Sequence, residues 1–303
     1  MRYFPAWARI ANWQVGRRRS SRADIRQIFY SSATRAQLDR HFIPLDNTAN
    51  ARPDWREYDP IRRCLLGNIE SFRDDVFYGF FSPRFGEKTG LSSQMVDQFI
   101  GQNSAFDVID FCREGFHQSL FLNTFVQGDQ IHIGFLDIAQ KVVGALGVDA
   151  DLSSLVMDTT CSPYSNHFVA KPRFWRRWLE FSEKIFCVAE GEGEIARMLR
   201  ADVTYSSRSR FSEAVVREDL PAKVFIIERL ASLILTLEPA WLSTAYQPFK
   251  SFDAENKSVH QSQIAFARQC DSLKSLYRKA PSPEYKRAYN QLLEGQPWRR
   301  KWL

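Results

Sequence analysis

The chain has 303 residues, of which 44% are hydrophobic, 25% charged and 14% aromatic. This composition is typical of a globular protein with a large apolar core, and it excludes a disordered chain, a collagen and a disulfide-stabilised miniprotein. The net charge of +6 comes from residues 1–23, which hold six arginines and no acid, so the other 280 residues are formally neutral. A neutral body argues against an extended face that follows nucleic-acid phosphates.

Cysteine spacing and hydropathy indicate the compartment. Five cysteines stand far apart, without a CxxC or Cys/His spacing typical of a metal site, which favours a reduced, cytoplasmic protein. No run reaches the roughly 18 apolar residues that a membrane-spanning helix needs. Residues 1–23 lack the features of a secretory signal and predict a flexible leader. Because arginines flank Trp7, Ile10 and Trp13, residues 1–22 could instead lie on an anionic membrane surface at the inner membrane.

The first half of the chain predicts strands that alternate with helices. Segments rich in β-branched and aromatic residues predict strands at Ile25–Tyr30, Val76–Phe81 and Asp107–Cys112. Helices are expected at 31–36, Ile61–Leu66 and Leu91–Ile100, the last with Leu91, Met95 and Phe99 on one face. Between them, residues 42–60 are rich in Pro, Asp and Asn and predict an ordered loop that faces a cleft.

The second half predicts mostly helices. They are expected at Ser119–Phe125, Ile138–Leu146, Phe174–Val188, Val224–Leu237 and Ser258–Leu293, with a polar insertion at Gln127–His132 and a short buried strand at Leu155–Asp158. The alternation predicts an α/β fold: one domain over residues 24–303, with a mostly parallel central sheet flanked by helices. The part from about residue 224 to 303 is expected to form a helical C-terminal appendage.

The sequence does not match the common nucleotide-binding motifs. The run Gly79–Thr89 (GFFSPRFGEKT) ends like a phosphate-binding loop, but Ser82 and Glu87 stand where that motif needs glycines. The run Gly191–Ala196 follows a predicted helix, not a strand, and places two acids where a pyrophosphate would bind. GxSxG and HExxH patterns are also missing from the sequence.

Three polar and aromatic segments remain as candidate sites. In the first, Asp46, Asn47, Asn50, Asp54 and Trp55 offer carboxylates and amides for hydroxyls or base edges beside an aromatic face. The alternative for this segment is that Asp46 and Asn47 form an Asx-turn and that Trp55 is a packing anchor.

The second segment, Asn123–Gly134, sets Asp129 and His132 close together around Gly128, which we expect to be flexible. A carboxylate that orients an imidazole, or acts alone as a base, serves acyl, glycosyl and phosphoryl transfer. Asp129 and His132 are therefore the candidate catalytic residues, with Gln127 beside them as a substrate ligand. The alternative is a helix cap next to a surface histidine.

The third segment, Tyr164–Trp175, passes from a polar loop through a short apolar strand into a helix behind Pro172. Ser165 and Asn166 could hold sugar hydroxyls, and Lys171 could hold phosphate oxygens. Trp175 and Trp178, three residues apart on one helix face, are expected to pack in the core.

Taken together, these segments resemble a family of glycosyltransferase-like bacterial proteins from surface-polysaccharide loci. The resemblance rests on IRQIFY, FIPLDNTANARPDWREYDPIRR, YGFFSPRFGEKTG, NTFVQGDQIHIG and YSNHFVAKPRFWRRW, which together cover about residues 25–185. By its layout the chain is also similar to nucleotide-sugar transferases of the GT-A kind. Those enzymes hold the donor diphosphate through a divalent metal bound by a DxD motif, and that motif is missing here.

The resemblance implies a cytoplasmic glycosyltransferase that moves a sugar from a nucleotide-sugar donor to a glycan or lipid-linked acceptor. The missing DxD motif leaves dependence on a divalent metal open, and no metal ligands are predicted. Without a metal, Lys88, Lys171 or an arginine would face the diphosphate. The alternatives are a non-catalytic module that binds carbohydrate or nucleotide, and a nucleic-acid-binding protein, which the neutral body disfavours. The transferase prediction requires that Asp46–Tyr58, Gln127–His132 and Ser165–Lys171 meet in one pocket.

Overall fold

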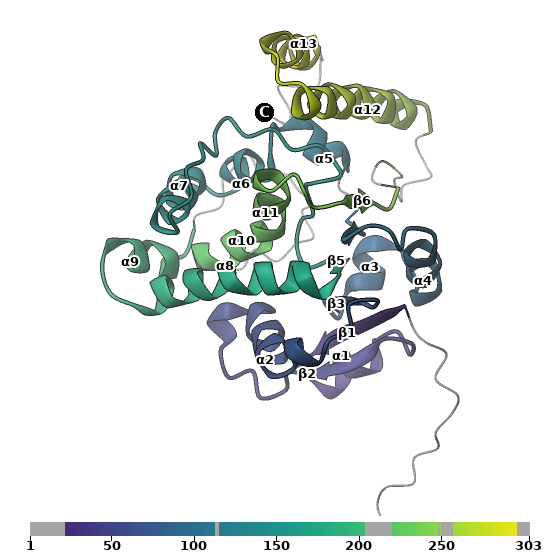
Figure 1. The fold of residues 1–303 in the computed structure, drawn as a ribbon, viewed down its shortest axis with the longest axis vertical. Helices are drawn as coiled ribbons and strands as arrows, with labels where there is room; N and C mark the ends of the chain where they lie inside the picture. The colour runs from purple at the N-terminus through teal and green to yellow at the C-terminus, as the bar shows by residue number, and fades with distance from the viewer. Residues whose placement is uncertain (1–21, 113–114, 204–219, 248, 250–256, 296–303) are drawn as a thin grey trace, which may run out of the picture.

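A computed structural model describes residues 22–112, 115–203, 220–247, 249 and 257–295. The described residues form an α/β fold (Figure 1). Its one mixed sheet has the strand order β2-β1-β3-β5-β4-β6. Its strands are β1 Ala23–Phe29, β2 Ile43–Asp46, β3 Phe77–Phe81, β4 Val108–Asp110, β5 Phe168–Ala170 and β6 Ser243–Ala245. Strand β5 runs antiparallel to β3 and β4, and every other neighbouring pair is parallel. The predicted α/β class and mostly parallel sheet are confirmed.

Alternate residues of the strands enter two separate cores, as the two-residue period of a strand requires. On β3, Tyr78 and Phe80 belong to one core, whereas Phe77 and Phe81 belong to the other. Gly79 lies between them because a Cβ at this position would meet Val169 Cγ1 at 2.7 Å. Both faces of the sheet are therefore covered.

One group of helices covers the first face. They are α2 Tyr58–Asn68, α7 Phe135–Ala145, α8 Pro172–Glu190, α10 Ala222–Glu228 and α11 Leu230–Leu237. Trp175 and Trp178 of α8 are buried there, as predicted, and the Trp175 indole donates to the Tyr78 carbonyl at 2.9 Å. The single helix predicted at Val224–Leu237 is broken at Arg229, where α10 ends and α11 begins.

Short helices cover the second face and the edges. Helices α3 Phe85–Thr89 and α4 Ser93–Gln102 lie on the second face. The smaller elements are α1 Ser32–Ala36, η1 Pro53–Trp55, η2 Ile69–Ser71, α6 Thr124–Ile131 and α9 Glu194–Arg200. Among the described residues, no helix combines the length and the hydropathy that a bilayer crossing needs.

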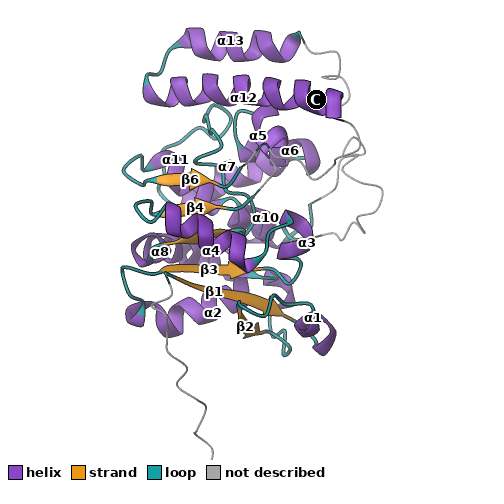
Figure 2. Ribbon diagram, turned by 90° about the vertical axis from the view of Figure 1, so that its right-hand side faces the viewer, coloured by secondary structure: helices purple, strands orange, loops and turns teal. Residues whose placement is uncertain are grey.

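The C-terminal helices form a separate layer. Helices α12 Lys257–Lys279 and α13 Pro283–Glu294 lie side by side over α5 Gly115–Leu120 (Figure 2). Leu120, Phe121, Phe266, Cys270 and Tyr289 pack between them. The part predicted to be helical from about residue 224 also supplies β6, which pairs with β4.

Two local predictions are wrong because tertiary pairing decides the structure there. Strand β2 lies inside the predicted loop 42–60, where Ile43 pairs with Arg26 of β1 at the sheet edge. An edge strand tolerates Pro44, which the sequence suggested would prevent regular structure. Leu155–Asp158 is buried but has no sheet partner among the described residues, and its Met157 N–H donates to the Leu122 carbonyl at 2.9 Å.

Two helix predictions also need correction. The predicted polar insertion Gln127–His132 lies almost wholly in α6, because Asn123 caps that helix by accepting from the Phe125 and Val126 N–H groups at 2.9 Å. The face of α4 is also shifted: Val96 and Ile100 are buried, but Met95 is 37% exposed.

Candidate functional site

A cavity of about 430 Å3 lies where three strands end, and we call it the strand-end cavity. Tyr30 follows β1, Ser82 follows β3, and Ser165–His167 precede the antiparallel β5, so all three segments reach the same edge of the sheet. Helix α10 forms a further wall with Val224, Ile227 and Glu228. Open α/β sheets bind ligands at this edge, outside the carboxyl ends of the parallel strands.

Two carboxylates face this cavity from opposite elements. Glu57 precedes α2, and its Oε2 accepts a hydrogen bond from Asn166 Nδ2 at 3.2 Å. Glu228 ends α10 and has no hydrogen-bond or ion-pair partner in the described part of the chain. Burial raises the pKa of both, and the Glu57 charge raises the pKa of Glu228 further. The negative charge of Glu57 therefore acts on the Glu228 carboxyl across the cavity.

Cationic side chains line the same cavity. Arg56, Arg84 and Lys88 contribute, and Arg84 also pairs with the exposed Glu87. The Lys88 ammonium is exposed and pairs with no described acid, yet its charge lowers the pKa of both Glu57 and Glu228. A cation that lies close to two carboxylates without binding either is placed to meet an anion that enters the cavity.

Uncommon backbone conformations concentrate around the cavity. Asn50, Arg56 and Ser165, with φ of 39°, 51° and 62°, all line it, and the fourth described non-glycine residue with positive φ is Gln247. Arg56 combines φ 51° with ψ −128°, a conformation that favours glycine. Strained residues of this kind persist where the surrounding structure holds them, commonly at ligand sites. At Arg56 the turn directs the following residue, Glu57, into the cavity.

Neutral polar groups complete the lining. The Ser82 hydroxyl is buried and makes no hydrogen bond in the described structure. Burial, helped by the Lys88 charge, lowers the pKa of His167 to about 3, so its imidazole is neutral at physiological pH. Burial and the Glu57 charge raise the pKa of Tyr30, so its hydroxyl stays protonated. These groups can exchange hydrogen bonds with hydroxyls without adding charge.

Five predicted site residues meet in the strand-end cavity: Asn50, Trp55, Lys88, Ser165 and Asn166. Trp55 is only 1% exposed, and its indole N–H donates to Glu190 Oε1 at 2.9 Å. It therefore acts as a packing anchor at the cavity wall, which is the alternative that the sequence had left open. The first and third predicted segments converge here.

Other residues of those two segments lie elsewhere. Asp46 forms an Asx-turn, accepting from the Thr48 N–H at 2.8 Å, and Asn47 is buried, accepting from Arg63 at 2.8 Å. Lys171 lies at the far end of β5, above the Phe77 ring at 4.1 Å. Three extended residues span about 10 Å, which keeps this ammonium from the Ser165 end of the strand.

Asp54 is also outside the cavity lining and belongs to an ion-pair network. Burial alone would raise its pKa, but hydrogen bonds from Arg52 and Lys223 bring the pKa down to about 2. Its carboxylate is thus fully ionised and occupied by protein cations. The prediction that Asp54 binds substrate has no support from this geometry.

The second predicted segment does not reach the cavity. Asp129 accepts the Leu136 N–H at 3.0 Å and so tethers the start of α7, and Gln127 accepts from Arg229 at 3.1 Å. His132 is 2% exposed with its ring 3.9 Å from that of Phe225, and burial lowers its pKa to about 4. Gly128 is a packed helix residue, since a Cβ would meet the Phe135 ring at 2.8 Å. Gln127, Asp129 and His132 do not line the strand-end cavity, so this geometry does not support the catalytic roles predicted for Asp129 and His132.

Sequence reasoning missed both acids of the cavity. Glu57 stands between the aromatic residues of the first segment, and Glu228 stands in VFIIERLASLIL, the most apolar run of the chain. A charged residue inside such a run is costly unless it is paired or functional, and this signal could have identified Glu228. Arg56 and Glu57 are recognisable as cavity residues only from the backbone turn that they form, and the sequence does not reveal this turn.

The described residues do not fit a metal site made by the protein alone. Among them, no group of three or more His, Cys, Asp and Glu side chains lies close enough together to hold an ion. Glu57 and Glu228 are two carboxylates with Lys88 close by, a set that suits an anionic ligand with hydroxyls better than a protein-held metal.

Comparison of the chain with models of protein families, with curated proteins and with solved structures finds no match.

Proposed function

We propose that this protein is a glycosyltransferase that moves a sugar from a nucleotide-sugar donor to a surface-polysaccharide or lipid-linked glycan acceptor. Only two of the three segments whose meeting the transferase prediction required reach the strand-end cavity, so the proposal rests instead on one observation: Glu57, Glu228 and Lys88 face one cavity at the carboxyl edge of a mostly parallel sheet. Glycosyl transfer needs a base for an acceptor hydroxyl and positive charge for a leaving diphosphate. The cavity offers both within a volume that suits a small-molecule ligand.

Glu228 is the proposed general base. It has no described protein partner, and burial raises its pKa toward the range in which a carboxylate accepts a proton most effectively. In the reaction, the acceptor hydroxyl gives its proton to Glu228 while its oxygen forms a bond to the anomeric carbon. The bond from that carbon to the diphosphate oxygen breaks, and the nucleoside diphosphate leaves with both electrons of that bond.

The other cavity residues bind and orient the substrates in this proposal. Lys88 and Arg56 face the diphosphate charge, and Ser82, Ser165 and Asn166 hold sugar hydroxyls. Glu57 is held by Asn166 and keeps the pKa of Glu228 high through its negative charge. The similarity to GT-A enzymes, which the sequence suggested, belongs to this proposal and is supported by the position of the cavity on the sheet.

Donor binding and donor turnover together test the proposal. The first experiment is a thermal-shift screen with UDP-, GDP-, CMP- and TDP-sugars. The sugar nucleotide with the matching nucleobase should stabilise the protein by about 2.7 kcal/mol at a hundredfold excess over Kd. The same donor with a glycan acceptor should then release free nucleotide. A non-catalytic binding module would show the thermal shift without the release, and no shift with any donor would contradict both functions.

The expected membrane contact rests on residues 1–22, almost all of which lie outside the described residues. We propose that this basic and aromatic segment holds the enzyme at an anionic membrane where a lipid-linked acceptor would be. Flotation with vesicles that contain anionic lipid should recover the full chain, and deletion of residues 1–22 should abolish recovery. A deletion variant that still floats would place the membrane contact elsewhere.

A further inference from the structure

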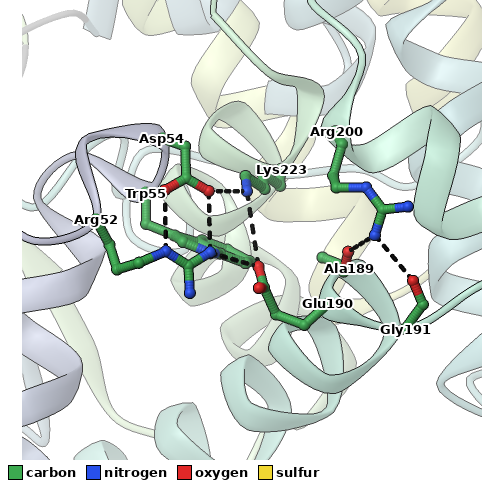
Figure 3. A network of polar contacts seen from close by, with 8 residues as sticks. All are labelled: Arg52, Asp54, Trp55, Ala189, Glu190, Gly191, Arg200 and Lys223. Atoms are coloured by element: carbon green, nitrogen blue, oxygen red, sulfur yellow. Dashed lines mark hydrogen bonds and ion pairs between the residues drawn. The ribbon is translucent and has the colours of Figure 1, made fainter.

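An ion-pair network lies behind the strand-end cavity. We call it the Lys223 network, and it consists of Arg52, Asp54, Glu190 and Lys223 (Figure 3). Arg52 donates to both carboxylate oxygens of Asp54, at 3.1 and 3.0 Å, and to Glu190 Oε1 at 2.7 Å. Lys223 donates to Asp54 Oδ2 and lies 3.8 Å from Glu190 Oε1. Two cations and two anions make the network electrically neutral.

The network joins the elements that carry the two cavity carboxylates. Asp54 is in η1, three residues before Glu57, and Lys223 is in α10, the helix that ends at Glu228. Glu190 ends α8, so the long helix of the first face serves as the common support. Trp55 completes the joint, because its indole donates to Glu190 and its ring lies 4.3 Å below the Lys223 ammonium.

Stability alone is a poor explanation for this arrangement. The Lys223 side chain is 2% exposed, and burying an ammonium costs free energy that its ion pairs offset only in part. An apolar side chain of similar size is often as stable at such a position. Ion pairs around a buried ammonium add a defined geometry, because their hydrogen bonds are directional whereas apolar packing is not; the other three members of the network are partly exposed.

We propose that the Lys223 network is a positioning device that sets the spacing of the Glu57 and Glu228 carboxylates across the strand-end cavity. This inference deepens the proposed function, since it concerns how the base of that site is held. Lys223, Asp54, Glu190 and Arg52 are positioning residues, and none of them lines the cavity.

The pKa of the Glu228 carboxyl depends directly on this spacing. The charged and titratable groups that surround it are Tyr30 after β1, Arg56 and Glu57 before α2, Arg84 and Lys88 around α3, His167 before β5 and Arg229 after α10. The Glu57 charge raises the pKa of Glu228, whereas the Arg229, Lys88 and Arg56 charges lower it. If α10 moves away from η1, Glu228 gains water and loses its neighbour Glu57, and both changes lower its pKa. The Lys88 and Arg56 charges recede as well, which raises the pKa, but burial is the largest of these causes and its loss makes the net change a fall.

The experiment is a carboxyl-carbon NMR titration of the ligand-free full chain labelled at glutamate, with Glu228→Gln to assign the signal. In Lys223→Met we expect the Glu228 pKa to fall toward the ordinary glutamate value of about 4.3. The direction of the change in the Glu228 pKa separates two explanations, because loss of a nearby positive charge would by itself raise the pKa of an acid. A fall therefore reports lost spacing and not the lost Lys223 charge.

Arg200→Met is the matched control. Arg200 donates to the Ala189 and Gly191 carbonyls at the same end of α8 but makes no described contact with the network (Figure 3). It should leave the Glu228 pKa unchanged, and Lys223→Arg should preserve it as well. Because the measurement needs no substrate, it can succeed even if the chain proves not to transfer sugars.

Arg52→Met provides a second variant if Lys223→Met fails to fold, because Arg52 is partly exposed and its loss removes three hydrogen bonds of the network. It should lower the Glu228 pKa in the same direction. A folded Lys223→Met or Arg52→Met protein whose Glu228 pKa is unchanged or raised would overturn the inference, as would an equal fall in Arg200→Met.

Discussion

Two clusters of charge in this molecule differ in how their members are satisfied. Under the C-terminal helices, Asp158, Asp271, Lys274 and Arg278 form what we call the docking cluster. Lys274 donates to the Gln118 and Phe121 carbonyls, Asp158 pairs with Arg278 at 2.8 Å, and Asp271 accepts from Thr159 twice, at 2.7 and 2.9 Å. Each buried charge there has protein partners.

The strand-end cavity shows the opposite pattern. Glu57 has a single amide donor, and Glu228, Lys88 and the Ser82 hydroxyl have no partner within the described residues. Perturbed pKa values occur in both clusters, so a shifted pKa alone does not identify a site. Unsatisfied polar groups around an open volume do identify a site, because a folded protein keeps such groups where the hydrogen bonds of a ligand complete them.

The largest stability effect is expected from the docking cluster. Lys274→Met leaves two buried carbonyls without their donor and should lower the free energy of unfolding by about 2–4 kcal/mol. Lys88→Met in the cavity should change it by less than about 0.5 kcal/mol. Urea unfolding of the two variants checks the contrast, and equal losses would erase the distinction between a structural and a functional lysine.

Acid should destabilise the protein partly through His132, which the sequence had suggested as a catalytic residue. Its folded-state pKa of about 4 lies below the ordinary value of about 6.5, so the unfolded chain takes up the proton first as the pH falls. The free energy of unfolding should therefore drop between about pH 6.5 and pH 4. The raised pKa values of Glu57 and Glu228 act in the opposite direction, because there the folded state takes up the proton first.

Urea unfolding at pH 7 and pH 5 measures the combined effect of the groups that titrate in this range, His167 included, and the His132 contribution should be about 2 kcal/mol from its two pKa values. In His132→Gln the difference between the two pH values should shrink by that amount. An unchanged difference would mean that His132 has the same pKa in the folded and unfolded chain, which would contradict its burial as a neutral imidazole.

Phosphate affinity should depend on Lys88 and not on Lys171. Lys88→Ala removes a charge that faces the cavity and should weaken binding of a nucleoside diphosphate by about tenfold, or 1.4 kcal/mol. Lys171→Ala removes a charge at the far end of β5 and should leave Kd unchanged. Calorimetric titration of both variants measures this Kd. A larger loss of affinity in Lys171→Ala would mean that the diphosphate binds outside the strand-end cavity.

The smallest effect concerns the backbone at Arg56. Arg56→Gly and Arg56→Ala both remove the guanidinium, but glycine adopts φ 51° and ψ −128° without strain. Arg56→Gly should therefore be more stable than Arg56→Ala by about 1 kcal/mol in thermal unfolding. Equal stability of the two variants would remove the argument that the turn before Glu57 is strained.

The sequence predicted the elements well where a local pattern decides them. Strand β1 and helix α8 follow from β-branched runs and from a helical repeat of buried aromatics, and the mostly parallel sheet follows from their alternation. The sequence prediction failed at β2, which is a strand because it pairs with β1. It also failed at Leu155–Asp158, which is not a strand because it has no strand to pair with among the described residues.

For the site, the sequence identified two of the three segments and the wrong acids. Lys88, Ser165 and Asn166 were found because polar residues next to strands and turns are conspicuous. Asp129 and His132 are close in sequence, but α6 directs them toward Leu136 and Phe225. Glu57 and Glu228 are 171 positions apart, and only the packing of α10 against the turn after η1 brings them together.

In the proposed reaction, Glu228 of the strand-end cavity is the general base, and Asp129 has no part in the chemistry. The most direct test of this claim is the rate of nucleotide release in Glu228→Gln and in Asp129→Asn, measured with the donor that stabilises the native protein and with a glycan acceptor. We predict that Glu228→Gln lowers this rate by about a hundredfold or more and still binds the donor, whereas Asp129→Asn keeps the native rate. Full activity in Glu228→Gln, or its loss in a folded Asp129→Asn protein, would contradict the claim.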